Sequence, residues 1–487
     1  MHDRNICFVS SEVAPFAKTG GLADVSGALP KYLARHGCDV RLFMPFYSGI
    51  DLSNGQFHVV EFLADLAVSF GGELIPYRVL TARLPDSGVD VYFVDCPRFY
   101  GRGSLYTDDA DEHLRFVLLS RAAIECCQRM GWAPDVMHCN DWQTALIPLY
   151  LRTIYSWDRM FSRTRTVLTI HNIAYQGVFP SGVIGSIGLE EYVSMFALED
   201  LHGGVINFLK TGIFYADVLT TVSATYAREI QTPEYGAGLH EFLRRRSDAL
   251  VGIVNGIDPA EWSPERDRLI PHHYSIDDLS GKEENRRFLL RSMGLPDDPH
   301  APVLGVVSRL TAQKGFDLFF DIMDDILAHR NIRFVVLGSG ESRYETFFAG
   351  LQQRHPQKAA FHAGFQNSLA HLIEAGSDIF LMPSQFEPCG LNQIYSLRYG
   401  TVPVVRRTGG LNDTVENFDS STGEGTGFVF DHFTPEGLRW GIERALETFQ
   451  HPETWRRLVR NAMSRDFSWD VQVEKYIELY DALAVGG

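Results

Sequence analysis

Residues 18–22, Lys-Thr-Gly-Gly-Leu, follow the first apolar run of the chain, residues 6–9, after a short loop. A strand–loop–helix junction of this kind exposes backbone N–H groups at a helix N-terminus, where an anion can bind. Gly20 and Gly21 let the backbone approach a phosphate closely, and Lys18 adds a positive charge. Alone this run is a weak signal, but matching residues in the second half of the chain strengthen it.

Arg309 and Lys314 follow a second apolar run, residues 303–307, and precede a helix predicted to begin near Gly315. A guanidinium can bind two oxygens of a diphosphate, and an ammonium adds a point charge. A solvated surface pair is the alternative. The position directly after a buried strand favours diphosphate binding.

Glu387 lies in residues 383–390, Pro-Ser-Gln-Phe-Glu-Pro-Cys-Gly, after the apolar run 379–382. Its carboxylate could accept sugar hydroxyls or stabilise developing positive charge, or it could be a structural carboxylate near a helix N-terminus. Gly390 and Leu391 open the next predicted helix, whose free N–H groups suit phosphate. Cys389 could be a nucleophile in principle, but no base is visible near it, so a pocket-lining thiol is favoured.

His171 and Asp141 follow two further apolar runs, residues 166–170 and 136–138. A histidine at a strand end is commonly a core residue, although its position opposite the 18–22 loop favours contact with a sugar. Asp141 could act near the reacting groups or cap the helix after it, and both interpretations stay open.

Short apolar runs alternate with longer helical patterns throughout. The predicted strands are residues 6–9, 40–44, 89–94, 136–138, 166–170, 218–222, 303–307, 332–337, 379–382 and 402–405. Continuous apolar runs without alternation indicate parallel strands covered on both faces. Two such series predict an α/β protein of two Rossmann-like, doubly wound domains, with polar strand ends facing a shared cleft.

The turn at Asn255-Gly256 ends an apolar run and marks the predicted hinge, so we expect domains at 1–255 and 256–465. Residues 466–487 form a predicted amphipathic helix behind a possible Ser468 cap. Its apolar face carries Val473, Tyr476, Ile477, Tyr480 and Leu483.

The chain of 487 residues carries a net charge of −17, which argues against a nucleic-acid or anionic-membrane partner. Seven cysteines without C-x-x-C pairs indicate buried, reduced thiols. The start of the chain lacks the apolar core of a signal peptide, and no stretch reaches the ~18 apolar residues of a membrane helix. These features predict a cytoplasmic protein.

No cofactor and no metal are expected. Residues 338–340, Gly-Ser-Gly, are followed by Arg343 in place of the glycine that a dinucleotide fingerprint needs. The one Asp-x-Asp, at Asp109 and Asp111, lies in an acidic polar stretch that we interpret as a solvated loop. Phosphate charge would then be neutralised by cations and backbone N–H groups.

With these motifs assembled, the chain resembles the bacterial glycogen synthases and plastid starch synthases from end to end. The resemblance rests on residues 11–15 (Ser-Glu-Val-Ala-Pro), 18–25 (Lys-Thr-Gly-Gly-Leu-Ala-Asp-Val), 171–177 (His-Asn-Ile-Ala-Tyr-Gln-Gly), 254–258 (Val-Asn-Gly-Ile-Asp) and 406–411 (Arg-Arg-Thr-Gly-Gly-Leu). It implies the glycosyltransferase-B fold, with the last helix crossing back onto the first domain. It also implies transfer of glucose from ADP-glucose to the non-reducing end of an α-1,4-glucan, with retention and without a metal.

The resemblance also implies residue roles. Lys18 and the Gly20 and Gly21 amides would contact the donor phosphates, completed by Arg309 and Lys314. Glu387 and His171 would hold the sugar, and Asp141 would lie near the reacting end. Cys389, Gly390, Leu391 and Asn255 would line the donor site, and Asp24 would join Asp141 on the acceptor side. Many related enzymes have Glu-x7-Glu, but Tyr395 stands at the second position here, so a ribose-binding glutamate is not carried over.

Two alternatives remain at this point. A glycosyltransferase of the same fold could use UDP-glucose or a small acceptor, because donor choice depends on loop details that the pattern does not reveal. An inactive glucan-binding homologue is the other alternative, and the intact set Lys18, Arg309, Lys314 and Glu387 argues against it.

Overall fold

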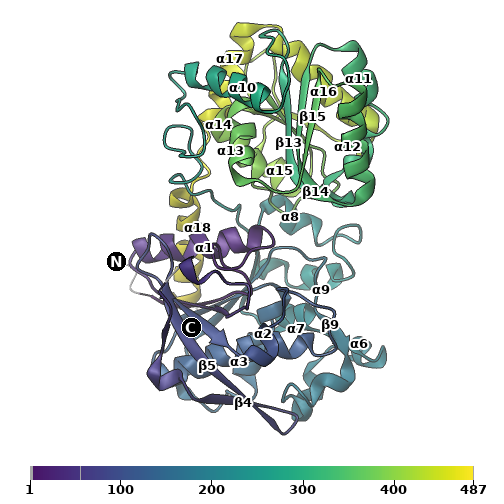
Figure 1. Ribbon diagram of the computed structural model, residues 1–487. Helices are drawn as coiled ribbons and strands as arrows, with labels where there is room; N and C mark the ends of the chain where they lie inside the picture. The colour runs from purple at the N-terminus through teal and green to yellow at the C-terminus, as the bar shows by residue number, and fades with distance from the viewer. Residues whose placement is uncertain (1–3, 55, 486–487) are drawn as a thin grey trace. The chain divides into compact units, whose positions relative to one another are not determined.

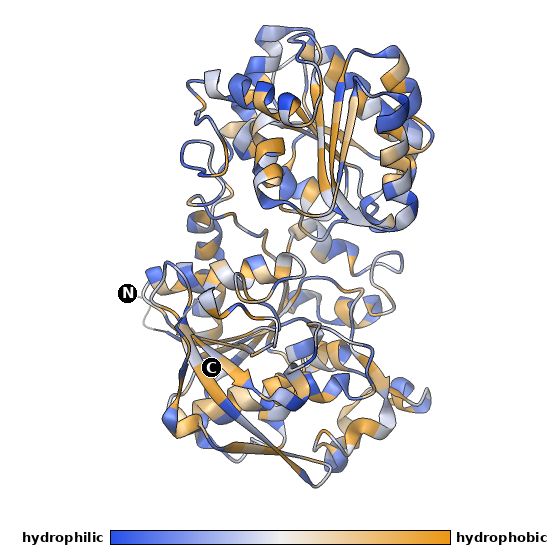
Figure 2. Cartoon of the chain, in the orientation of Figure 1, coloured by the Kyte–Doolittle hydropathy of each residue, from blue (hydrophilic) through white to orange (hydrophobic). Residues whose placement is uncertain are grey.

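The computed structural model describes residues 4–54 and 56–485, which divide into two compact units (Figure 1). The first unit comprises the chain up to Val222, Ala227–Ile253 and the last helix, and the second comprises Ser223–Tyr226 and Val254–Ser468. In both units the strands are the most hydrophobic segments and the helices carry the polar surface (Figure 2). Each unit is described by itself.

The first unit is built on a twisted sheet in which parallel strands are extended at one edge by antiparallel ones. The parallel strands, in spatial order, are β12 (Leu250–Gly252), β11 (Val218–Thr221), β8 (Arg165–Ile170), β7 (Val136–Asn140), β1 (Asn5–Val9), β2 (Asp39–Pro45) and β6 (Asp90–Asp95). The antiparallel strands are β5 (Glu73–Arg83), β3 (His58–Val59) and β4 (Leu66–Phe70). A separate pair joins β9 (Val178–Pro180) and β10 (Val205–Asn207).

The central strands of this sheet are buried because helices cover both faces. Ile6, Phe8 and Val9 of β1 are fully buried, as the continuous apolar run predicts. The α-helices of this unit are α1 (Gly21–Arg35), α2 (Pro97–Tyr100), α3 (Glu112–Met130), α4 (Asp141–Thr144), α5 (Ile147–Arg152), α6 (Leu198–His202), α7 (Phe208–Tyr215), α9 (His240–Arg245) and α18 (Trp469–Val485). Helix α8 (Ala224–Glu229) begins in the segment that groups with the second unit.

Helix α18 lies beside α1 in the first unit and buries the apolar face predicted for it. Val473, Tyr476 and Tyr480 are fully buried. The Tyr480 hydroxyl lies 2.6 Å from Nδ1 of His138 in β7, whose Nε2 lies 2.6 Å from the Thr169 hydroxyl in β8. The last helix is therefore fixed to the two strands whose ends carry Asp141 and His171.

The second unit is a parallel sheet covered by helices on both faces. Its strand order is β15 (Ala359–Ala363), β14 (Arg333–Gly340), β13 (Val303–Leu310), β16 (Ile379–Met382), β17 (Val402–Arg406) and β18 (Phe428–Phe430). The α-helices are α10 (Ser280–Ser292), α11 (Met323–His329), α12 (Ser342–Arg354), α13 (Asn367–Gly376), α14 (Asn392–Tyr399), α15 (Gly409–Thr414), α16 (Pro435–Phe449) and α17 (Pro452–Met463). Both units thus have the predicted Rossmann-like architecture.

One local prediction was wrong. No α-helix begins near Gly315, where the chain instead forms two short 3₁₀ turns, 312–314 and 316–319, before α11. Gly315 has φ +77°, and a Cβ on it would lie 2.0 Å from the carbonyl oxygen of Pro383. The close approach of the 383–390 loop therefore replaces the helix start with a tight turn.

Candidate active site

The 18–22 loop of the first unit is organised around the buried carboxylate of Glu12. The Thr19 and Gly20 amides both donate to Oε2 of Glu12, the latter over 3.3 Å, and the Thr19 hydroxyl donates to Oε1 over 2.7 Å. The predicted helix start at Gly21 is confirmed. Two amides of the loop therefore already bind the Glu12 carboxylate. These bonds fix the loop conformation at the N-terminus of α1, the kind of position where anions bind.

Lys18 is exposed and forms an ion pair with Asp24 one turn into α1, with 2.6 Å between Nζ and Oδ1. Burial raises the pKa of Asp24, and Lys18 opposes that shift. The ammonium is therefore held over the first turn of α1 by a carboxylate of the same helix. Lys18 and Asp24, predicted on the donor and acceptor sides, are direct neighbours.

Asp141 and His171 meet where β7 and β8 end. The Asp141 carboxylate accepts the His171 backbone N–H over 2.7 Å and a further backbone N–H from Asn172. Asp141 has φ +54°, a left-handed conformation that aspartate tolerates better than most residues. Its side chain binds the two amides that follow β8, so the alternative in which it caps the helix after it is wrong.

Burial sets the charge states of these two residues. It raises the pKa of Asp141 to about 7, a shift that the two backbone N–H groups oppose. It lowers the pKa of His171 to about 3, which keeps the imidazole neutral at physiological pH.

The tautomer of His171 follows from its partner. The Asn140 amide donates through Nδ2 to the Val9 carbonyl, so its Oδ1 accepts the hydrogen of His171 Nε2 over 2.9 Å. Nδ1 of His171 is therefore the nitrogen with a free lone pair. This site combines a neutral hydrogen-bond acceptor with a carboxyl group that titrates near neutrality.

In the second unit, Lys314 and Glu387 form a largely buried ion pair with 2.6 Å between Nζ and Oε2. The Ser384 hydroxyl donates to the same oxygen over 3.0 Å. In the described part of the chain, Oε1 of Glu387 has no hydrogen-bond partner, so it can accept one from a ligand. Lys314 was predicted to bind phosphate and Glu387 to hold the sugar, and the two lie in direct contact.

Two glycines of residues 406–411 let the backbone around Glu387 pack tightly. A Cβ on Gly409 would lie 1.9 Å from the Glu387 carbonyl oxygen, and one on Gly410 would lie 2.0 Å from that of Cys389. The Gly410 amide donates to the Glu387 carbonyl over 3.1 Å. These glycines thus fix the backbone that presents the Glu387 carboxylate.

The remaining predicted residues of this unit differ in exposure. Arg309 is exposed near the end of β13, and within residues 4–54 and 56–485 its guanidinium has no partner. Cys389 is buried, accepts a backbone N–H from Asn255, and has a pKa raised by burial to about 12, so it stays a neutral thiol. Gly390 adopts φ +73° and Leu391 is the N-cap of α14, as the predicted helix start requires.

Tyr395, at the position of a second glutamate in many related enzymes, belongs to the core. Its ring is stacked on the indole of Trp262 at 3.6 Å, and His371 stacks on Trp262 at 3.7 Å. Tyr395 is 8% exposed. It therefore packs α14 in place instead of offering a carboxylate.

Several residues of the two clusters were missed. Glu12 and Asn140 were not assigned a role in advance, although each follows a predicted strand and that position was a usable signal. Nothing local distinguished Ser384 or Tyr106, whose hydroxyl donates to Glu12.

Among the described residues there is no group of three or more His, Cys, Asp or Glu side chains arranged to hold a metal ion. Of the described helices, none is both long enough and apolar enough to span a bilayer.

The whole chain is similar to proteins of known families. Residues 5–245 match the family described as starch synthase catalytic domain, and residues 294–464 match glycosyl transferases group 1. Glycogen synthase of Koribacter versatilis is 46% identical over 98% of both chains. Glycogen synthase of Desulforudis audaxviator is 48% identical over 99% of this chain and 97% of the relative.

Two solved structures are similar to this chain in fold. The catalytic domain of Starch Synthase IV from Arabidopsis thaliana, bound to ADP and acarbose, is 33% identical with a TM-score of 0.91, covering 99% of this chain and all of that one. Sucrose-phosphate synthase from Thermosynechococcus elongatus, at 16% identity and a TM-score of 0.61, shares the fold. The Rossmann-like units therefore form a glycosyltransferase-B fold, and the chain belongs to the glycogen synthase and starch synthase family of glycosyltransferases.

Proposed function

We propose that this enzyme transfers glucose from ADP-glucose to the non-reducing end of an α-1,4-glucan, with retention at the anomeric carbon. The relatives named glycogen synthase support the polymer product. The starch synthase bound to ADP and acarbose supports an adenine nucleotide donor and a glucan acceptor. We also propose that it acts in the cytoplasm.

The observation that carries the proposal is the cation set of the second unit. Arg309, near the end of β13, offers a guanidinium with no partner among the described residues, and Lys314, shortly after that strand, offers an ammonium. Two cations at the carboxyl end of a parallel sheet suit a diphosphate, and the N-terminus of α14 at Leu391 adds backbone N–H groups. We assign the nucleotide diphosphate to this unit, with Cys389, Gly390 and Asn255 lining its site.

Glu387 supplies the negative charge that the reaction needs. Retention without an evident nucleophile points to departure of ADP through an oxocarbenium-like state, in which positive charge develops at the anomeric carbon. The Glu387 carboxylate, oriented by Lys314 and Ser384, can accept sugar hydroxyls through Oε1 and stabilise that charge. Lys314 can in turn stabilise the negative charge that develops on the departing diphosphate.

The first unit supplies neutral contacts to the sugar. His171 can accept a sugar hydroxyl at Nδ1, because its Nε2–H is directed to Asn140. Asp141 and Asp24 are assigned to the acceptor side, with Asp141 ionised above about pH 7. Lys18 and the Gly21 amide, for which the described residues provide no acceptor, are assigned to the donor phosphates.

Nucleotide release measured with two donors tests the proposal. The purified protein is incubated with ADP-glucose or UDP-glucose, with glycogen or a small sugar as acceptor, and with Glu387→Gln as the inactive control. We expect ADP release that depends on glycogen, and new linkages that an α-1,4-specific glucanase removes. A preference for UDP-glucose or a small acceptor would overturn the substrate assignment, and release equal to that of Glu387→Gln would identify an inactive homologue.

A further inference from the structure

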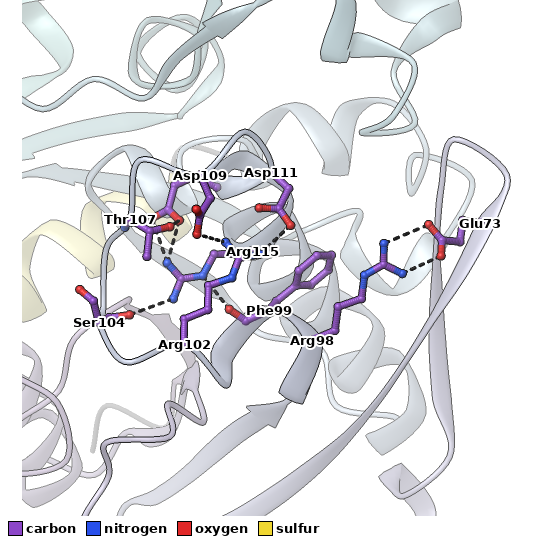
Figure 3. A network of polar contacts seen from close by, with 10 residues as sticks. Glu73, Arg98, Phe99, Arg102, Ser104, Thr107, Asp109, Asp111 and Arg115 are labelled. Atoms are coloured by element: carbon purple, nitrogen blue, oxygen red, sulfur yellow. Dashed lines mark hydrogen bonds and ion pairs between the residues drawn. The ribbon is translucent and has the colours of Figure 1, made fainter.

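A buried ion pair in α3 lies next to the 101–111 loop of the first unit (Figure 3). Arg115 is fully buried and donates to both carboxylate oxygens of Glu112, over 2.7 and 3.0 Å. Its other nitrogens donate to the carbonyl groups of Phe99 and Ser104. A buried guanidinium is tolerated when its N–H donors all have acceptors. The Arg115 guanidinium therefore fixes the backbone at Phe99 and Ser104 as well as the Glu112 carboxylate.

The pair fixes the loop that follows β6. Glu112 accepts the Thr107 backbone N–H over 3.1 Å and the Thr107 hydroxyl over 2.6 Å. Arg102, in the same loop, donates to Asp109 and Asp111, whose carboxylates stay solvent-exposed as the prediction of a solvated loop requires. Glu112 therefore holds the loop through Thr107. Arg102 joins the two ends of the loop through Asp109 and Asp111 (Figure 3).

Tyr106 links the 101–111 loop to the Glu12 carboxylate of the candidate active site. It lies next to Thr107 in the loop, and its hydroxyl donates to Oε1 of Glu12 over 2.6 Å and lies 2.9 Å from the Ser11 hydroxyl. Desolvation and the neighbouring Glu12 raise the pKa of Tyr106, which keeps the phenol protonated as a donor. Glu12 in turn holds the amides of Thr19 and Gly20.

We infer that Arg115 is a positioning residue for the 18–22 loop. It acts through Glu112, which fixes Thr107, and through Tyr106, whose hydroxyl orients the Glu12 carboxylate that holds the loop amides. The inference rests on the proposed function only where it links that loop to the donor. The chain of contacts itself can be tested without any substrate.

Tyr106→Phe is the sharpest variant because it removes one hydroxyl and keeps the ring. Without that hydroxyl, Oε1 of Glu12 keeps only the Thr19 hydroxyl as a donor, so the carboxylate that holds the loop amides is less firmly oriented. We expect backbone amides of residues 18–22 to exchange hydrogen about tenfold faster or more than in wild type, with exchange in the central strands unchanged. Unchanged exchange at residues 18–22 in folded Tyr106→Phe would overturn the inference.

Glu112→Gln and Arg115→Met test whether the buried ion pair is what orders residues 101–111 and, through them, residues 18–22. We expect Glu112→Gln to accelerate exchange both in residues 101–111 and in residues 18–22. Arg115→Met leaves Glu112 buried and unpaired, so that variant can fail to fold; Glu112→Gln keeps the proposal testable. Acceleration confined to residues 101–111 would show that the pair serves only its own loop.

Arg98→Met is the matched control, because Arg98 flanks the other end of the loop and, like Arg115, donates to both oxygens of one carboxylate, that of exposed Glu73 (Figure 3). We expect wild-type exchange and kinetics from it. For Tyr106→Phe we expect kcat/KM for ADP-glucose to fall about tenfold, with the KM for glycogen unchanged. Faster loop exchange without that kinetic loss would keep the positioning contact and refute the donor assignment of the loop, whereas wild-type exchange refutes the positioning itself.

Discussion

In the first unit, the charged groups of the candidate site already have protein partners, whereas the second unit presents a guanidinium without one. Lys18 is paired with Asp24, and Glu12 holds two loop amides. Arg309 is exposed and, among the described residues, unpaired. The charges of the first cluster are therefore largely neutralised before a ligand binds, whereas Arg309 of the second cluster is available to a ligand.

The pKa shifts extend this difference. Burial holds His171 neutral and brings Asp141 to a pKa of about 7, so the first unit offers polar groups of low charge. Such groups suit hydroxyl-rich sugars, which need directed hydrogen bonds more than charge. Arg309, which has no partner among the described residues, and Lys314 are cations of the kind that suit a diphosphate. We therefore propose that the first unit chiefly binds sugar and the second chiefly stabilises charge.

Removing the carboxylate of the second unit should have the largest effect. In Glu387→Gln, Lys314 loses its charge partner and the anomeric centre loses its stabilising anion, so we expect kcat to fall on the order of 100- to 1,000-fold. The measurement is ADP release from ADP-glucose with glycogen. Glu443→Gln, which breaks the surface pair with Arg330, is the control. A loss below about threefold would remove Glu387 from the chemistry.

Arg309→Ala should separate binding from folding. A charge-assisted contact contributes ~1.5–3 kcal/mol, so we expect kcat/KM for ADP-glucose to fall roughly 10- to 150-fold. The melting temperature should stay that of wild type, because no described residue depends on this guanidinium. Arg330→Ala serves as the control for loss of a surface arginine. Lower stability with full activity per folded molecule would make Arg309 structural.

The sequence predicted the parallel core well because buried strands need continuous apolar runs. All ten predicted strands correspond to strands of the two sheets. The strands β3, β4, β5, β9, β10, β12, β15 and β18 were missed. In β5 the reason is plain, since it alternates buried and exposed residues and contains Pro76, a pattern unlike that of the core strands. The helix expected near Gly315 was wrong because a distant loop, at Pro383, approaches the backbone there.

The partners within each candidate site were harder to predict. Residues after strand ends could be named in advance because parallel strands gather their carboxyl ends. Which of them pair could not, since Lys314 and Glu387 are 73 residues apart and Tyr106 and Glu12 are 94 apart. Charge states such as that of Asp141 depend on burial, which only the folded chain supplies.

Lys18→Ala tests the paired cation against the unpaired one. The ammonium is exposed and shared with Asp24, so part of its charge is already neutralised. We expect kcat/KM for ADP-glucose to fall about tenfold, less than for Arg309→Ala, with unchanged melting. Lys31→Ala, on the same helix, is the control. A larger loss than that of Arg309→Ala would reverse the assignment of charge stabilisation to the second unit.

Asp141 should give the activity a pH dependence near neutrality. The carboxyl gains a proton as pH falls through its pKa of about 7, and its charge is then lost. We expect kcat/KM to fall about threefold between about pH 7.5 and 6.5, and Asp141→Asn to lose this limb. His171 cannot account for it, because its pKa is about 3.

Stability should move in the opposite direction for Asp141, which provides an internal control. Its folded pKa lies above the unfolded value near 3.8, so the folded state binds the proton more tightly between those values. Wild type therefore loses stability relative to Asp141→Asn as pH rises from about 4 to about 7, and the difference stays constant above. Melting temperatures of both proteins across this range would show it, and a constant difference throughout would refute the raised pKa.

The smallest expected effect is that of removing divalent metal. A nucleotide-sugar diphosphate needs its charge neutralised, and the second unit provides Arg309 and Lys314 for that purpose. The carboxylates of Asp109 and Asp111 are bound to Arg102 in the 101–111 loop of the first unit. We therefore expect enzyme treated with EDTA to keep its full rate of ADP release, with no gain from added Mg²⁺ or Mn²⁺. Loss of activity that Mg²⁺ restores in wild type would show that the two cations are insufficient. If Mg²⁺ were needed only by Arg309→Ala, the metal would be replacing the missing guanidinium, and the assignment of diphosphate charge to the second unit would be strengthened.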